Sequence, residues 1–149
     1  MASLNEVELQ DWGRRIGQAA SPPLVIALRG DLGTGKTTLA RAIAEGAGVE
    51  GPVPSPTYNL LFRYWATEGR HVVHIDLFRI QHESEVWELG WEELPSESEI
   101  VLIEWPESAE EVLPEPRWEI RLREAESPDA RLVTLEAVGE PSPIPDPGG

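Results

Sequence analysis

The chain of 149 residues has the length of one domain and can bury a single hydrophobic core. It has no cysteine, which excludes disulfides and thiolate metal sites, and its net charge of −15 opposes direct binding of a polyanion such as RNA. It shows neither the basic and apolar regions of a signal peptide nor an apolar run near membrane-span length. We therefore expect a cytoplasmic protein without membrane contact.

The first predicted element is a helix over residues 5–20, where apolar residues recur at helical spacing. Ser3 and Glu6 have the spacing of a capping box at its start. Two prolines end the helix. Residues 24–28 then form a continuous apolar run, which predicts a strand that is covered on both faces.

A glycine-rich sequence, Gly-Asp-Leu-Gly-Thr-Gly-Lys-Thr-Thr, follows this strand at residues 30–38. It fits the phosphate-binding loop pattern of glycine, four residues, glycine, lysine, and serine or threonine. Apolar spacing predicts a helix directly after it, so the loop has the strand and helix that the pattern requires. Lys36 is the only lysine among twelve basic residues. The sequence therefore predicts a nucleotide site here.

The residue types of the loop predict their roles. Glycine backbones let amide groups point at phosphate oxygens, and the helix adds its positive end. Lys36 is predicted to reach the β and γ phosphates, and Thr37 to offer its hydroxyl to Mg²⁺. The predicted ATP-binding residues of the loop are Gly33, Thr34, Gly35, Lys36, Thr37 and Thr38.

Further along the chain, three prolines in residues 51–56 predict a stiff surface connection. Residues 57–65 and 71–76 are predicted strands that a turn at 68–69 joins. Residues 81–99 contain seven glutamates and no lysine or arginine, interleaved with apolar residues. They predict an amphipathic helix and a short turn, with the acidic side either solvated, which we favour, or a docking surface for a basic partner.

The remaining segments complete an α/β fold. We expect a three-layer sandwich of the P-loop nucleotide hydrolase type, with a central, mostly parallel sheet and antiparallel edge strands. Residues 1–140 form the domain, and the four prolines and two glycines of residues 141–149 predict a disordered tail. The last predicted elements are a central strand at 100–103, a short helix at 107–113, and strands toward the edge at 118–122 and 132–138, with a turn at 127–129.

Two acidic residues end predicted strands, where ligands of such sheets bind. Glu104 is predicted to bind Mg²⁺ directly or through a water molecule. Asp76 is predicted to orient the attacking water or to hold a metal-bound water. With Lys36 they form the predicted catalytic set. Thr57 either senses the γ phosphate or caps a strand. Arg79 either touches phosphate or, as we favour, pairs with an acid.

The three histidines, His71, His74 and His82, lack a metal-binding spacing and are predicted to be structural. The adenine-contacting residues are not apparent, although the first helix near residues 4–8 is a candidate.

Four further motifs accompany the phosphate loop: Ser-Pro-Thr-Tyr at 55–58, His-Ile-Asp-Leu-Phe-Arg at 74–79, Glu-Leu-Gly at 88–90 and Ile-Glu-Trp-Pro-Glu at 103–107. Together these motifs resemble the bacterial family of tRNA threonylcarbamoyladenosine biosynthesis ATPases called TsaE or YjeE. The resemblance runs from about residue 4 to residue 138. The phosphate loop is shared by many ATPases, whereas its combination with the other motifs is specific. Thr34 stands where the family often has alanine, and Phe78 where tyrosine is common.

This resemblance implies ATP binding and Mg²⁺-dependent hydrolysis. It implies partners as well: the TsaB and TsaD protein subunits, with tRNA reached only indirectly through the complex. Trp105 resembles a functionally sensitive tryptophan of the family. The implied roles are phosphate binding for Lys36, Mg²⁺ binding for Thr37 and Glu104, and switch-like positions near the γ phosphate for Asp76 and Thr57.

Two other functions remain open. One is a small P-loop kinase of a metabolite, and the other is a nucleotide-gated binding module with incidental hydrolysis. A GTPase is disfavoured, because the guanine-reading Asn-Lys-x-Asp pattern needs a lysine and the only one is Lys36. We expect weak hydrolysis by the chain alone, since no arginine is clearly placed to stabilise the transition state.

Overall fold

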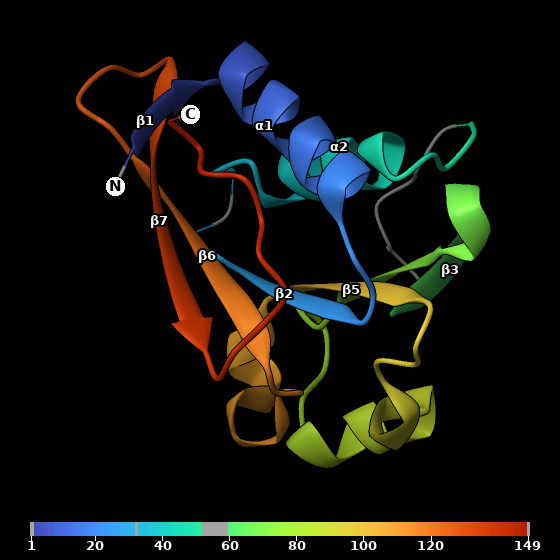
Figure 1. Cartoon of the computed structure of the whole chain (residues 1–149). Coiled ribbons are helices and arrows are strands. Elements are labelled where there is room, and N and C mark those ends of the chain that lie inside the picture. Colours follow the sequence, from blue (N-terminus) through green and yellow to red (C-terminus); the bar gives the residue numbers. More distant parts are fainter. Residues whose placement is uncertain (1, 32, 52–59, 149) are drawn as a thin grey trace.

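The computed structural model describes residues 2–31, 33–51 and 60–148, and its centre is one mixed sheet of seven strands (Figure 1). The strand order is β1-β7-β6-β2-β5-β4-β3. The strands are β1 (Ala2–Asn5), β2 (Leu24–Arg29), β3 (Leu61–Trp65), β4 (His71–Asp76), β5 (Glu99–Glu104), β6 (Arg117–Glu124) and β7 (Ala130–Val138).

Parallel strands occupy the middle of the sheet. The neighbours β6, β2, β5 and β4 pair in parallel, whereas β1 with β7, β7 with β6, and β4 with β3 pair in antiparallel fashion. A parallel centre with antiparallel edges is confirmed. The sheet as a whole is mixed rather than mostly parallel, because β1 at the far edge adds a further antiparallel pairing. This strand was not predicted.

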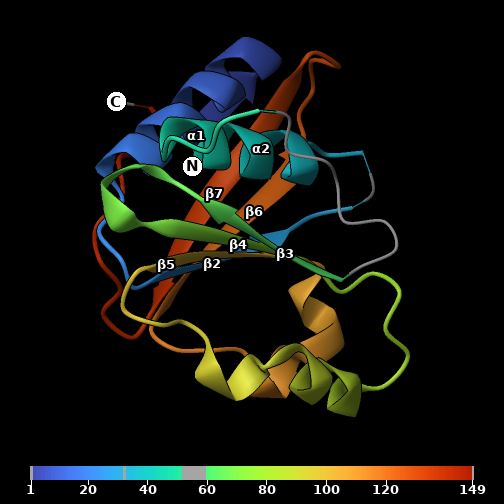
Figure 2. The ribbon, with the colours of Figure 1, turned by 90° about the vertical axis from the view of Figure 1, so that its right-hand side faces the viewer.

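Both faces of the sheet are covered, as Figure 2 shows. The helices α1 (Glu6–Ala19) and α2 (Lys36–Gly46) lie on one face, and three short 3₁₀ helices lie on the other. No helix in the described ranges is long and apolar enough to cross a bilayer. The 3₁₀ helices of the second face are η2 (Glu83–Leu89), η3 (Trp91–Glu93) and η4 (Pro106–Val112), and η1 (Thr67–Gly69) joins β3 to β4.

Two predicted helix details are wrong. Asn5, not Ser3, caps α1: its side-chain oxygen accepts from the Glu8 backbone N–H at 2.8 Å, and the Glu8 carboxylate accepts from the Asn5 N–H at 2.9 Å. Ser3 is instead paired within β1. The acidic segment forms η2 and η3 rather than one amphipathic helix, because Gly90 adopts a left-handed conformation with φ of 77° between them.

The two helices on the first face pack unusually closely. A Cβ atom placed on Gly17 of α1 would lie 2.0 Å from the Ile43 carbonyl oxygen of α2. A Cβ on Gly46 would lie 2.1 Å from the Arg14 carbonyl oxygen. Glycine at these positions lets the backbones meet, which holds the start of α1 beside the loop that precedes α2.

The proline-rich segment after β7 differs from the predicted disordered tail. It runs back along the sheet toward α1 (Figure 1). The Trp118 indole N–H donates to the Ser142 carbonyl at 2.7 Å, and the Trp12 indole N–H donates to the Pro145 carbonyl at 2.8 Å. Ile144 packs on the core between these contacts. Buried indoles need acceptors, and the tail supplies them.

Candidate functional site

The phosphate-binding loop connects β2 to α2, as the sequence predicts. Gly30 and Gly35 have φ angles of 146° and 104°, and a Cβ at Gly30 would lie 2.5 Å from the Leu122 carbonyl oxygen. The Thr34 hydroxyl donates to the Asp31 carbonyl at 2.8 Å, which closes the turn. Among the residues that the structure describes, no side chain caps the start of α2, so its first amide groups can bind an anion.

A cavity of about 330 Å³ lies where this loop meets the ends of β4 and β5. It brings together the predicted catalytic residues and the predicted metal residues. The Thr37 hydroxyl donates to Glu104 Oε1 at 2.8 Å across the cavity floor. The lining residues are Gly33, Gly35, Lys36, Thr37, Thr38, Asp76, Phe78, Glu104 and Trp105.

Lys36 is held inside this cavity by the loop itself. Its ammonium group donates to the carbonyls of Gly30 and Asp31 and lies 3.3 Å from the centroid of the Trp105 ring. Burial lowers the pKa of Lys36, and nearby carboxylates, Glu104 foremost, oppose that shift. The lysine is therefore a desolvated cation at the point where phosphate is predicted to bind.

Asp76 faces Glu104 from the neighbouring strand, since the two residues are in register between β4 and β5. Its Oδ1 accepts from the Phe78 backbone N–H at 2.9 Å. Burial raises the pKa of Asp76, and the charge of Glu104 adds to that shift while the Phe78 N–H and Lys36 oppose it. A water on this carboxylate would lie in the same cavity as Lys36 and Glu104.

Trp105 shapes the remaining wall. Its backbone is left-handed, with φ of 56°, which is rare for a bulky residue and turns the chain at the end of β5. Its ring lies 4.9 Å from that of Phe78, centroid to centroid, and covers Lys36. The indole therefore closes the cavity on the side of the lysine.

Two predicted residues do not join this cluster. Thr57 lies outside the described residues. Arg79 is exposed and does not line the cavity, and no ion pair links it to another residue of the described ranges, so the favoured ion pair is not observed.

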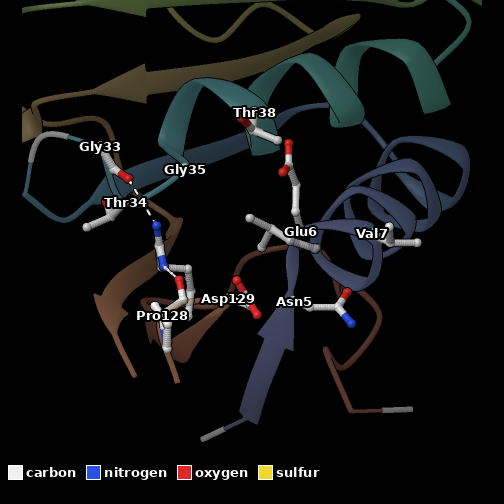
Figure 3. Close-up of a pocket in the computed structure, with 11 residues that line it drawn as sticks. Asn5, Glu6, Val7, Gly33, Thr34, Gly35, Thr38, Pro128 and Asp129 are labelled. Atoms are coloured by element: carbon white, nitrogen blue, oxygen red, sulfur yellow. Dashed lines mark hydrogen bonds between the residues drawn. The ribbon is translucent and has the colours of Figure 1, made fainter. Parts of the chain in front are cut away.

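A second cavity, of about 510 Å³, opens on the other side of the same loop (Figure 3). Gly33, Thr34, Gly35 and Thr38 form one wall, and the start of α1, from Asn5 to Leu9, forms another. This second wall coincides with the candidate helix for adenine contacts. The third wall comes from the turn before β7 and from the start of β7, and it consists of Pro128, Asp129 and Arg131.

Sequence reasoning missed this third wall. Arg131 donates to the Gly33 carbonyl of the loop at 3.4 Å and to the Pro128 and Ala130 carbonyls at 3.2 and 2.9 Å. The parallel pairing of β6 with β2 brings the turn after β6 beside the loop, and the Arg131–Gly33 hydrogen bond joins residues 98 positions apart in sequence. No local pattern marks Arg131 as a site residue.

The donors in the first cavity are hard oxygens, which suit Mg²⁺. They are the Thr37 hydroxyl and the carboxylates of Glu104 and Asp76. Within the described ranges, no three His, Asp or Glu side chains cluster closely enough to hold a metal by themselves. Such a set fits Mg²⁺ that is bound by one or two protein groups together with phosphate and water.

Comparisons with known proteins agree with one another. The family model described as threonylcarbamoyl adenosine biosynthesis protein TsaE matches residues 3–133. The chain is 36% identical over 138 residues to the tRNA threonylcarbamoyladenosine biosynthesis protein TsaE of Bacillus subtilis, covering 92% of this chain and 84% of that protein. The protein of the same name from Streptomyces coelicolor is 33% identical over 137 residues, which cover 89% of this chain and 92% of that one.

The fold comparison gives the same result. The crystal structure of YdiB from Bacillus subtilis superposes with a TM-score of 0.71 and 29% sequence identity, over 93% of this chain and 84% of that one. The region that the family model matches, residues 3–133, contains the whole phosphate-binding loop, both strand-end acids and all three residues of the third wall of the second cavity. The chain therefore belongs to the TsaE family of threonylcarbamoyl adenosine biosynthesis proteins.

Proposed function

We propose that this chain is the ATP-binding and ATP-hydrolysing protein of tRNA threonylcarbamoyladenosine biosynthesis, with a fold of the P-loop nucleotide hydrolase type. The observation that carries the proposal is the convergence of Lys36, Thr37, Asp76 and Glu104 on one cavity beside the uncapped start of α2. Family membership supports the same pathway.

Each side chain has a role that its position supports. Lys36 exchanges its loop carbonyls for the β and γ phosphate oxygens, and the first amides of α2 bind the same phosphates. Thr37 and Glu104 hold Mg²⁺, which supplies charge neutralisation of the phosphate oxygens when bound. Asp76 accepts a hydrogen bond from the attacking water and orients it in line with the γ phosphate.

The second cavity receives the nucleoside. Because Gly33, Gly35 and Thr38 line both cavities, a nucleotide with its phosphates on the loop extends its sugar and base toward α1 and the turn before β7. Leu9 and Pro128 offer apolar contacts, and the guanidinium of Arg131 offers donors at the rim.

Hydrolysis by the isolated chain is slow in this proposal. None of the described arginines lines the cavity around Lys36, so the transition-state charge lacks the stabilisation that an arginine gives, worth about 10³–10⁵ in rate. The TsaB and TsaD subunits complete the site or order the segments around it. The acidic chain, with its net charge of −15, contacts these proteins and reaches tRNA only through them.

The test is ATP hydrolysis by the chain alone and with purified TsaB and TsaD. We expect slow turnover alone, faster turnover in the complex, and loss of both with Lys36→Ala. Equal and fast rates with and without the partners would contradict the proposed dependence. Complexes of TsaB and TsaD without the chain provide the background rate.

A second candidate is a nucleotide-gated binding module whose ATP state sets partner affinity. The absence of an arginine from the described lining of the Lys36 cavity favours it, since hydrolysis is then incidental. An Asp76→Asn variant that binds ATP, does not hydrolyse it and still supports tRNA modification would select this candidate over the hydrolase.

A further inference from the structure

A buried histidine stands directly behind the candidate metal site. His74 lies on β4 and is 1% exposed. β4 and β5 pair in parallel with His74 opposite Leu102 and Asp76 opposite Glu104. Because side chains alternate along strands, His74 and Glu104 share the face of the sheet that α2 covers.

The imidazole contacts the carboxylate that Thr37 also contacts. His74 Nε2 lies 2.5 Å from Glu104 Oε2, while Glu104 Oε1 accepts from the Thr37 hydroxyl at 2.8 Å. Each carboxylate oxygen therefore has its own protein partner, and the plane of the carboxylate is fixed from both sides. The carboxylate is 3% exposed, so no bulk water competes for it.

The other ring nitrogen of His74 makes no such contact. His74 Nδ1 is buried and has no hydrogen-bond partner among the described residues. The neighbours on this face, Val72 and Leu102, are fully buried and apolar, so packing alone would favour an apolar residue, which has no ring nitrogen to leave unpaired. The contact with Glu104 explains why a histidine occupies the position.

We infer that His74 is a positioning residue: its Nε2–H donates to Glu104 and sets the carboxylate so that Oε1 faces Thr37 and the bound metal. This inference rests on the proposed function, because it assigns Glu104 to Mg²⁺. A carboxylate can only accept, so Nε2 is the nitrogen that carries the proton. Partners of this kind behind metal ligands change metal affinity or activity by about 10–100-fold when removed.

The first test compares His74→Phe with His74→Gln by calorimetry, using ATP with Mg²⁺ and ATP with EDTA. Phenylalanine keeps the ring and removes the donor, whereas the glutamine amide places a donor near the position of Nε2. We expect His74→Phe to weaken Mg²⁺-ATP binding about 10–100-fold and to leave metal-free ATP binding within about twofold. His74→Gln should retain most of the Mg²⁺-ATP affinity. His71→Gln, on the same strand, is the control and should match wild type.

The outcomes separate the possible errors. Wild-type affinity for Mg²⁺-ATP in His74→Phe would overturn the inference, and so would an equal loss with and without Mg²⁺, which indicates a structural role. Equal losses in His74→Gln and His74→Phe would overturn the donor role. A wild-type chain that binds no Mg²⁺-ATP would overturn the proposed function itself, and the inference with it.

A second test needs no variant of His74. Two-dimensional NMR of ¹⁵N-labelled imidazoles reports which ring nitrogens carry protons, and His71→Gln and His82→Gln assign the three signals. We expect a proton on Nε2 of His74 in the intact, metal-free chain. An unprotonated Nε2 would overturn the inference even if His74→Phe failed to fold.

Discussion

The two cavities on either side of the phosphate-binding loop are built differently. The first cavity, which we propose binds the phosphates and call the phosphate cavity, is lined by buried polar side chains. Lys36 is 5% exposed and Glu104 is 2% exposed, and Glu104 accepts a hydrogen bond from Thr37. The second cavity, which we propose receives the nucleoside and call the nucleoside cavity, is lined by the exposed start of α1, where Val7 is 73% exposed, and by the exposed residues Pro128 and Asp129. One side is preorganised, and the other is open.

This difference predicts how binding energy is distributed. Contacts made by buried, charged groups contribute more than contacts made at an open rim, because fewer water molecules compete with them. We therefore expect the phosphates to account for most of the affinity and all of the metal dependence. We expect the base and sugar to contribute modestly and to account for nucleotide selectivity.

The largest effect should come from Glu104→Gln. Glutamine can keep a contact with Thr37 but removes the charge that we propose holds Mg²⁺, so ATP turnover should fall by about 10²–10³-fold in the proposed complex with TsaB and TsaD. Steady-state phosphate release measures it. Glu111→Gln, at an exposed position of η4, is the control and should have no effect. Unchanged turnover in Glu104→Gln would show that the Glu104 carboxylate does not hold the metal.

The next effect concerns affinity. Lys36→Ala should weaken ATP and inorganic triphosphate alike by about 10–150-fold, which corresponds to charge-assisted hydrogen bonds worth about 1.5–3 kcal/mol. Arg14→Ala, which removes a cation in a surface ion pair with Glu45, is the matched control. If Lys36→Ala weakened ATP but not triphosphate, the lysine would not lie on the phosphates.

A smaller effect should appear on the nucleoside side. Arg131→Ala should weaken ATP about 2–10-fold, from the loss of one hydrogen bond worth about 0.5–1.5 kcal/mol, and should leave triphosphate binding unchanged. Competition binding with both ligands measures the ratio. An equal loss for both ligands would show that Arg131 acts through the loop carbonyl of Gly33 rather than through the nucleoside.

The smallest effect concerns stability. Because burial raises the pKa of Asp76 above its ordinary value of 3.8, the folded chain favours the protonated acid. The stability that this group contributes is present below that ordinary value and is lost as pH rises through the raised one. Asp76→Asn should therefore raise the unfolding midpoint at about pH 7, with a gain that shrinks toward about pH 4.

Urea unfolding at both pH values measures this difference. Asp129→Asn, at an exposed position of the nucleoside cavity, is the control for the change from a carboxylate to an amide. A loss of stability in Asp76→Asn at neutral pH would contradict the claim that burial of the charged Asp76 carboxylate destabilises the folded chain.

The same contrast decides what could be predicted from sequence. Continuous apolar runs gave β2 and β5 correctly, because a strand buried on both faces has little alternative. The loop and the acids that end β4 and β5 follow from the parallel order of these strands. The sequence alone could therefore place four residues at one site: Lys36, Thr37, Asp76 and Glu104.

The nucleoside side could not be predicted in the same way. Its wall at the start of α1 follows β1, a four-residue edge strand too short to leave a pattern, and its wall at Arg131 depends on the pairing of β6 with β2 and of β7 with β6. Local signals there were misleading as well, since Ser3 fits a capping box while Asn5 makes the cap. His74 gave no metal-binding spacing, because its partner is a single carboxylate on the neighbouring strand.

The most direct measurement is calorimetry of the intact chain with Mg²⁺-ATP, beside Lys36→Ala. We expect the wild type to bind one nucleotide per chain, with an affinity that falls at least about tenfold in the variant. No heat from folded wild-type chain, alone or with TsaB and TsaD, would contradict the claim that the loop at residues 30–38 binds a nucleotide.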